Sequence, residues 1–284
     1  MSGRGMEGRV CVITGATAGL GQAAATELAR RGATVVLVAR SPERAENTRK
    51  AVVRAAGHDR VHVVRADLAV QAQVRAAAAE IMERWPAVHV LINNAGVYTR
   101  TLQLTPDGIE TQWAVNHLAP FLLTNLLLDR LRASAPARVV TMSSGAHRGA
   151  ALRLDDVEMR GKYNGLRQYA NTKLANILFT RELARRVPPA QVTANALHPG
   201  VVATELLFGG FAPLRLLKFF MKTPEQGART TVYLASFPDV ATVTGGYFQD
   251  ERPARITSAA QDDTAARRLW EISEQMTGLP GIRK

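Results

Sequence analysis

The stretch "RVCVITGATAGLGQ", residues 9–22, decides the fold of this chain. Its first half is an apolar, β-branched run that predicts a buried strand, and its second half carries Gly15, Gly19 and Gly21. Glycine lets a backbone approach a pyrophosphate closely, and the free N–H groups at a helix start attract its charge. A plain strand-to-helix turn is the alternative. The context between a strand and a helix favours a dinucleotide-binding loop.

Outward from this loop, apolar runs rich in β-branched residues alternate with longer helical patterns. Fully apolar strands that alternate with helices are typical of a parallel sheet covered on both faces. We therefore expect an α/β fold, a doubly wound Rossmann-type domain with a mostly parallel seven-stranded sheet. With no repeat, linker or second core, residues 1–284 are expected to form a single domain. The expected strands are 9–15, 34–40, 61–68, 88–96, 137–144, 191–200 and 245–249, and the expected helical stretches are 21–32, 42–56, 70–85, 108–132 and 166–187.

Composition narrows the class of protein. A hydrophobic fraction of 46% over 284 residues is typical of a globular protein with a real core. The one cysteine, Cys11, lies in an apolar run, which excludes a disulfide framework and favours a reducing compartment. Residues 1–9 lack the apolar core of a signal peptide, and no stretch approaches the roughly 18 apolar residues of a spanning helix. We expect a cytoplasmic protein.

The net charge of +12 raises the question of a nucleic-acid partner. The arginines, however, are scattered along the whole chain, and no run of five basic residues occurs. An anionic small molecule explains the charge as well, so we expect no nucleic-acid binding.

The ends of the second and third expected strands bear on the cofactor. Arg40 stands where an acidic residue would bind a ribose 2′-hydroxyl, and a guanidinium suits a 2′-phosphate instead. The glycine loop itself has Ala18, not a basic residue, so the prediction of NADP(H) over NAD(H) rests on Arg40, helped by Arg44. A solvated surface arginine is the alternative. Asp67 and Leu68 would contact the adenine, unless Asp67 is a helix N-cap.

Five motifs recur in the order typical of one family. They are "TGATAGLG" (14–21), "NNAG" (93–96), "VNHLA" (115–119), "TMSS" (141–144) and "YANTK" (169–173), followed by "HPG" (198–200). By these motifs the chain resembles the short-chain dehydrogenase/reductase family over nearly its whole length, and its retinol-dehydrogenase-like branch most of all. The likeness to the branch rests on "SSGAH", "YANTKLANILFTRELARR", "HPGVVATEL", "MKTPEQGARTTVYLA", "GGYF" and "AARRLWEISEQMTG".

The resemblance implies an NADP(H)-dependent oxidoreductase that interconverts an aldehyde or ketone and its alcohol. By matching motifs, Tyr169 would be the acid/base, with Lys173 beside it. Ser144 would bind the substrate oxygen, and Ser143 would support the loop or the cofactor. Asn116 matches the position that holds a water in a proton relay with the lysine.

Tyr169 and Lys173 are four residues apart, so on a helix both project from one face. A free tyrosine has a pKa near 10, which is a poor match to neutral pH. A cation about 4 Å away contributes roughly 4 kcal/mol at an effective dielectric near 20, or up to about three pKa units. We expect Lys173 to lower the pKa of Tyr169. Tyr163 is rejected as the acid, because its i+4 neighbour is Arg167.

The resemblance also implies the cofactor-binding residues. His117 and His147 lack metal-ligand spacing, and His198 is expected to shape a turn over the nicotinamide, so no metal site is expected. The expected cofactor contacts are Gly15, Thr17, Ala18, Gly19, Leu20, Gly21, Arg40, Asp67, Leu68, Asn94, Ala95, Gly96, Tyr169, Lys173, Pro199, Gly200, Val202 and Thr204.

Two segments bear on the substrate. Ser144 precedes Tyr169 by 25 residues, more than in many family members, and the extra polar segment 152–165 is expected to be a surface excursion. The branch carries a similar insertion. Residues 205–227 combine large apolar side chains with two glycines, and by resemblance they form a flexible lid for a hydrophobic substrate. Helices packed on the core are the alternative.

Other functional questions stay open at this level. Basic residues in the lid permit weak docking on an anionic membrane surface. Family resemblance allows a homodimer or a homotetramer. Two other functions are a non-catalytic NADP(H)-binding regulator or scaffold, and a reductase that acts on a double bond.

Overall fold

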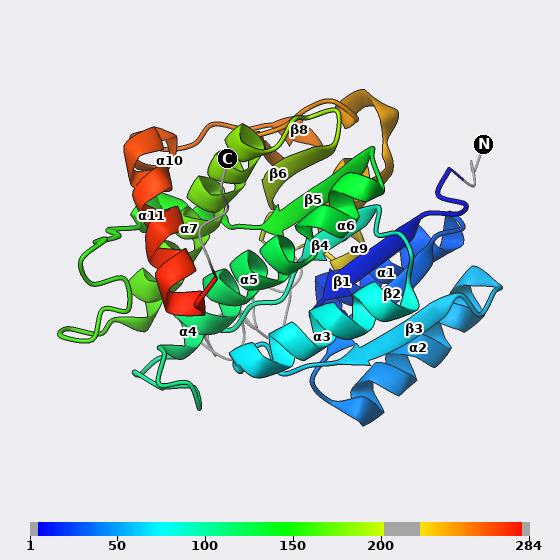
Figure 1. The fold of residues 1–284 in the computed structure, drawn as a ribbon, viewed down its shortest axis with the longest axis horizontal. Helices are drawn as coiled ribbons and strands as arrows, with labels where there is room; N and C mark the ends of the chain where they lie inside the picture. Colours follow the sequence, from blue (N-terminus) through cyan, green and yellow to red (C-terminus); the bar gives the residue numbers. More distant parts are fainter. Residues whose placement is uncertain (1–4, 202–221, 280–284) are drawn as a thin grey trace.

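The computed structural model describes residues 5–201 and 222–279 of the chain. Its centre is an eight-stranded sheet in the order β3-β2-β1-β4-β5-β6-β7-β8, parallel at every pairing except that of β7 with β8 (Figure 1). The expected count of seven is one short, because a two-residue strand leaves no sequence pattern. The strands are β1 (Val10–Thr14), β2 (Thr34–Ala39), β3 (Val61–Arg65), β4 (Val90–Asn93), β5 (Ala137–Met142), β6 (Val192–His198), β7 (Tyr247–Gln249) and β8 (Arg252–Pro253).

Helices cover both faces of the sheet, which confirms the doubly wound fold. In β1, Val12 packs into one hydrophobic cluster with α3, α5 and α7, whereas Cys11 and Ile13 pack into another with α1, α2 and α9. Figure 1 shows α11 (red) lying along α7, at the opposite end of the molecule from α2 (blue). The longer helices are α1 (Gly19–Arg30), α2 (Pro42–Ala56), α3 (Gln71–Arg84), α5 (Ala119–Leu126), α6 (Leu128–Ala133), α7 (Gly165–Arg186), α9 (Pro224–Ser236) and α11 (Asp263–Thr277). None of the helices in the described ranges is both long and apolar enough to cross a membrane.

The region 108–132, expected to hold helical stretches, contains several short segments. A short helix α4 (Thr111–Trp113) passes into a π-helical turn, η1 (Ala114–Leu118), and then into α5. A π-turn widens the helix by one residue per turn and displaces a backbone carbonyl from the regular ladder. The expected site residue Asn116 lies at the middle of this turn.

The insertion 152–165 runs mainly along the surface, as expected, and it is anchored to the core at Val157. Val157 is 7% exposed and belongs to a hydrophobic cluster with residues of α7 and α11. The carboxylate of Glu110 is fully buried, and it joins α4, the insertion and α7 through four hydrogen bonds of 2.7–3.0 Å. Its donors are Gln112 N, Trp113 N, Tyr163 Oη and Gln168 Nε2.

Most of the expected lid 205–227, together with Val202 and Thr204, lies outside the described residues. Residues 224–227, at the end of this segment, belong to helix α9, which agrees with the alternative of helices packed on the core. Thr223 and Gln226 form a reciprocal capping box that begins α9, and Gly227 is buried where α9 packs on the protein.

Candidate active site

The carboxyl ends of β1 and β4 form the edge at which the order of the sheet reverses. The chain runs from β1 outward to β3, and then returns to the other side of β1 as β4. In open α/β sheets, ligands bind in the crevice outside such a switch point. The glycine loop and the "NNAG" segment leave these two strand ends.

The glycine loop packs too closely for side chains at two positions. Gly15 has φ +64°, and a Cβ there would lie 2.7 Å from Ala95 Cα. A Cβ at Gly21 would lie 2.4 Å from the carbonyl oxygen of Gly15. Both glycines are therefore required by the backbone itself.

Asn94 holds this loop in place. Its Nδ2 donates to the carbonyl oxygens of Thr14 at 2.9 Å and of Gly15 at 3.0 Å. The backbone N–H groups of Asn94 and Ala95 both donate to Thr14 Oγ1, at 3.0 and 3.1 Å. The Asn94 side chain is thus committed to tying β1 to β4.

The start of α1 fits an anion. Its N-cap is Ala18, which offers no side-chain acceptor, and its first turn contains no acidic residue. The N–H groups of the first turn therefore have no capping side chain, and they carry the positive end of the helix dipole. Leu20 packs against the core beside them, and the Thr17 carbonyl accepts from Thr48 Oγ1. Residues 15–21 thus fit the pyrophosphate of a dinucleotide.

Arg40 and Asp67 lie together at the ends of β2 and β3. Arg40 Nη1 is 3.7 Å from Asp67 Oδ2, and the arginine side chain is 78% exposed. Asp67 also accepts from Ala69 N, and the N-cap of α3 is Val70, so the N-cap alternative for Asp67 is wrong. Leu68 packs against the core.

Tyr169 and Lys173 share one face of α7, next to Ser144. The Nζ of Lys173 lies 5.4 Å from the centroid of the Tyr169 ring and donates to Met142 O at 3.3 Å. The Ser144 side chain lies near the Tyr169 hydroxyl, where it acts to lower the pKa of Tyr169. Ser143 Oγ donates to the carbonyl of Lys173 at 2.7 Å. The structure thus brings three of the expected catalytic residues together.

Burial dominates the titration of this pair. It raises the pKa of Tyr169 to about 12, against the opposing effect of the nearby Ser144 side chain. It lowers the pKa of Lys173 from 10.5 to about 8. The expectation that Lys173 brings the pKa of Tyr169 below its ordinary value is therefore wrong for the protein alone. Lys173 is still mainly a cation at neutral pH.

Asn116 lies close by, but its side chain is committed elsewhere. Its Oδ1 accepts from Val97 N at 2.7 Å, and its Nδ2 donates to Val97 O at 2.9 Å and Thr172 Oγ1 at 3.2 Å. The backbone carbonyl of Asn116 accepts from Asn176 Nδ2 at 2.9 Å. Any proton relay through Asn116 would therefore use its backbone and not its amide.

The "HPG" segment leaves the end of β6. Gly200 has φ +87°, and a Cβ there would lie 3.0 Å from the Lys222 side chain, which pairs with Asp250. Burial is the main cause that lowers the pKa of His198 to about 4. Pro199, between His198 and Gly200 in the sequence, is partly buried.

The family model described as "short chain dehydrogenase" matches residues 9–208. The chain belongs to the short-chain dehydrogenase family. It is 43% identical to human retinol dehydrogenase 14, over 96% of this chain and 88% of that protein. A crystal structure of an uncharacterized Mycobacterium paratuberculosis protein is 35% identical, with a TM-score of 0.78 over 96% of this chain and 94% of that one. A Beutenbergia cavernae protein described as an NAD(P)-dependent gluconate 5-dehydrogenase, with bound NADP at low occupancy, is 26% identical, with a TM-score of 0.72 over 87% of this chain and 96% of that one.

Two residues of this short-chain dehydrogenase escaped the sequence analysis. The ring of Tyr98 meets that of Tyr169 edge-on, with centroids 6.3 Å apart. Asn176 contacts both Asn116 and Met142. Tyr98 directly follows the "NNAG" segment by two residues, and Asn176 follows Lys173 by three, so only their spacing from motif residues could have indicated them.

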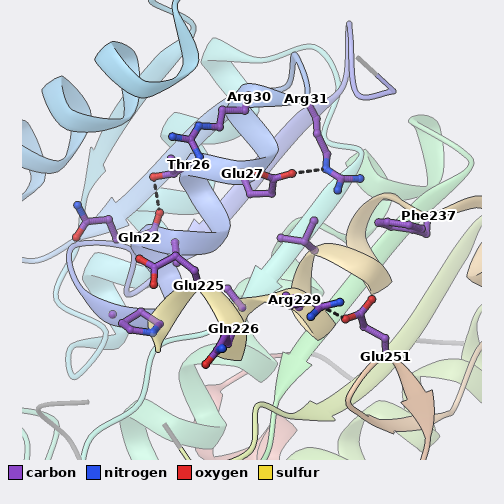
Figure 2. A pocket seen from close by; sticks show the side chains of 15 residues that line it. Gln22, Thr26, Glu27, Arg30, Arg31, Glu225, Gln226, Arg229, Phe237 and Glu251 are labelled. Atoms are coloured by element: carbon purple, nitrogen blue, oxygen red, sulfur yellow. Dashed lines mark hydrogen bonds and ion pairs between the residues drawn. The ribbon is translucent and has the colours of Figure 1, made fainter. Parts of the chain in front are cut away.

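A pocket of about 740 Å³ lies between α1 and α9, and Figure 2 shows its side chains. It includes Gly19 but none of the four expected catalytic residues. Two of its arginines are already paired, Arg31 with Glu27 and Arg229 with Glu251, each at 2.9 Å. The pocket therefore borders the glycine loop at Gly19 but does not hold the expected catalytic residues. Within residues 5–201 and 222–279, no cluster of three or more His, Cys, Asp or Glu side chains could hold a metal ion.

Proposed function

We propose that this short-chain dehydrogenase is an NADP(H)-dependent oxidoreductase that interconverts a hydrophobic aldehyde or ketone and its alcohol, with Tyr169 as the acid/base. The observation that carries the proposal is the convergence of Ser144, Tyr169 and Lys173 at the sheet edge that also bears the glycine loop. The alternative of a non-catalytic NADP(H)-binding regulator has no support in the comparisons.

Each side chain has a role that follows from its chemistry. The bound nicotinamide supplies or accepts the hydride. Tyr169 gives a proton to the substrate oxygen, or takes it back in the oxidation. Ser144 hydrogen-bonds that oxygen and stabilises its developing charge. Lys173, a cation at neutral pH 5.4 Å from the ring centroid, stabilises the phenolate when Tyr169 has lost its proton.

Arg40 supports NADP(H) over NAD(H). Its pairing with Asp67 is long, at 3.7 Å, and lies at the surface, where ion pairs contribute little. The guanidinium can therefore exchange this partner for a 2′-phosphate, which binds it through charge-assisted hydrogen bonds. The NADP-bound structural relative is consistent with this choice.

The substrate class rests on the relatives and on the apolar composition of 205–227. Human retinol dehydrogenase 14 is named for a long apolar alcohol, and we extend only that chemical class to this protein. The cytoplasmic location, the oligomeric state and the weak membrane association stay predictions from the sequence.

The test is the turnover of NADPH and NADH by purified protein with a panel of apolar aldehydes and ketones that includes retinal. The proposal predicts turnover with NADPH and slower turnover with NADH. A protein that binds NADPH but oxidises it with no member of the panel would count against the proposal, and a clear preference for NADH would overturn the cofactor assignment.

Removing the guanidinium of Arg40 tests the cofactor assignment directly. Arg40→Ala should raise the KM for NADPH by about 10- to 100-fold, as expected for lost charge-assisted hydrogen bonds, and leave the KM for NADH within about twofold. Arg54→Ala, at an exposed arginine of the neighbouring helix α2, is the matched control. Equal effects of Arg40→Ala on both cofactors would contradict a 2′-phosphate contact.

A further inference from the structure

Asn176 lies three residues beyond Lys173 on α7 and is 1% exposed. Its Nδ2 donates to two backbone carbonyls, Asn116 O at 2.9 Å and Met142 O at 3.0 Å. Lys173 Nζ donates to the same Met142 O at 3.3 Å, and this is its one hydrogen bond to the described part of the chain. The amide and the ammonium therefore share an acceptor.

The two carbonyls fix the direction of the Asn176 amide. A carbonyl oxygen only accepts, so Nδ2 faces both carbonyls and Oδ1 faces His117 Nδ1, 3.3 Å away. His117 is neutral at pH 7, because burial lowers its pKa to about 4. The other ring nitrogen, Nε2, lies 2.9 Å from Ser273 Oγ, which itself donates to Leu269 O at 2.8 Å. The amide is thus held at each of its polar atoms.

This one amide joins three segments that carry the proposed site. It reaches the π-turn η1 through Asn116 and the end of β5 through Met142, and it belongs to α7 itself. An ammonium has three protons, and Lys173 uses one of them on the described chain. If the amide were removed, the Asn116 and Met142 carbonyls would each lose a donor, and Met142 O would be left to the ammonium alone among these side chains.

We propose that Asn176 is a positioning residue for Lys173: its amide occupies the Asn116 and Met142 carbonyls and so keeps the ammonium beside the Tyr169 ring. The inference rests on the proposed function and deepens it, because it names a residue that acts through Lys173.

The groups around Lys173 make this measurable. Tyr169 on its own helix and His117 on η1 are uncharged at neutral pH, and burial is the cause of the lowered Lys173 pKa. A carbonyl newly available to the ammonium stabilises the charged form and must raise that pKa.

The experiment compares Asn176→Leu with Asn171→Leu by NMR titration of lysine labelled with ¹³C at Cε. The Lys173 signal is assigned by its loss in Lys173→Met. Asn171 is the matched control: it is fully buried on the same helix, but it bonds Ala151 N and Met159 Sδ.

Asn176→Leu should raise the pKa of Lys173 by about one unit and lower kcat about tenfold, with KM within about twofold. Asn171→Leu should leave the Lys173 pKa unchanged, even where it lowers the melting temperature. Identical Lys173 titrations in wild type and Asn176→Leu would overturn the inference. Asn176→Ala takes the place of Asn176→Leu if that variant does not fold. If the wild type turns over no substrate, the proposed function fails, while the titration still decides the role of Asn176.

Discussion

Tyr163 and Tyr169 are two phenols at the same end of the molecule, and burial raises the pKa of each to about 12. The hydroxyl of Tyr163 is surrounded, since it hydrogen-bonds Thr99, Gln112 and Glu110 at 2.8 Å each. That of Tyr169 meets the Ser144 side chain, with the Lys173 ammonium nearby. The difference teaches that the pKa of a phenol does not identify an acid. What identifies it is a hydroxyl with bonding capacity left for a ligand and a cation close enough to stabilise its anion.

The largest expected effect separates the two tyrosines. Tyr169→Phe should lower kcat about 1,000-fold, because general acid–base catalysis contributes about 10²- to 10⁴-fold. Tyr163→Phe should change kcat by less than about threefold. Steady-state NADPH oxidation with the best apolar carbonyl measures both. Equal losses of kcat in the two variants would contradict the assignment of Tyr169, and not Tyr163, as the acid/base.

Lys173→Met should separate activity from stability. We expect kcat to fall about 100-fold, because the phenolate loses its cation. A pKa lowered from 10.5 to about 8 corresponds to a penalty of about 3 kcal/mol at pH 7, so the variant should be more stable by up to this amount.

The sign of the pH dependence follows from the same shift. Between pH 8 and 10.5 the folded protein binds fewer protons at Lys173 than the unfolded chain, so the wild-type free energy of unfolding gains on the variant as pH rises. Denaturant unfolding of both proteins at pH 7 and pH 9.5 measures the gap. A gap that does not narrow at pH 9.5 would contradict an uncompensated buried ammonium.

Glu110→Gln tests the surroundings of Tyr163, whose hydroxyl donates to Glu110. A neutral amide has one acceptor oxygen in place of two, so buried donors around it lose their partners, at about 2 kcal/mol of unfolding free energy. The kcat should change by less than about threefold, since this network anchors the insertion. Guanidinium unfolding midpoints, with Tyr163→Phe as the milder companion, provide the measurement. A large loss of kcat at unchanged stability would move Glu110 into the catalytic machinery.

The elements of the fold that depend on local sequence patterns could be predicted. Strands β1 to β6 followed from apolar β-branched runs, β7 was expected in the short stretch "GGYFQ", and the glycine loop followed from its place between β1 and α1. The π-turn around Asn116 could not be predicted. The apolar pattern of a helix shows which residues face the core, and it does not reveal one extra residue in a single turn. The two residues of β8 were too few for any pattern.

For the site, the residues were predicted and their partners were not. The spacing of Tyr169 and Lys173 placed them on one face of α7, which the structure bears out. Burial, which sets both pKa values, depends on segments far away in the chain. The hydrogen bonds of Asn94, Glu110 and Asn176 likewise join residues about 50–80 positions apart, and no local pattern records such pairs.

The most direct test of the central claim, that Tyr169 exchanges a proton with the substrate oxygen under the influence of Lys173, is a crystal structure with NADP⁺ and an apolar alcohol. We predict the alcohol oxygen within about 3 Å of both the Tyr169 hydroxyl and Ser144 Oγ. An alcohol oxygen bound by other side chains, or a Tyr169 hydroxyl turned away from it, would contradict the account.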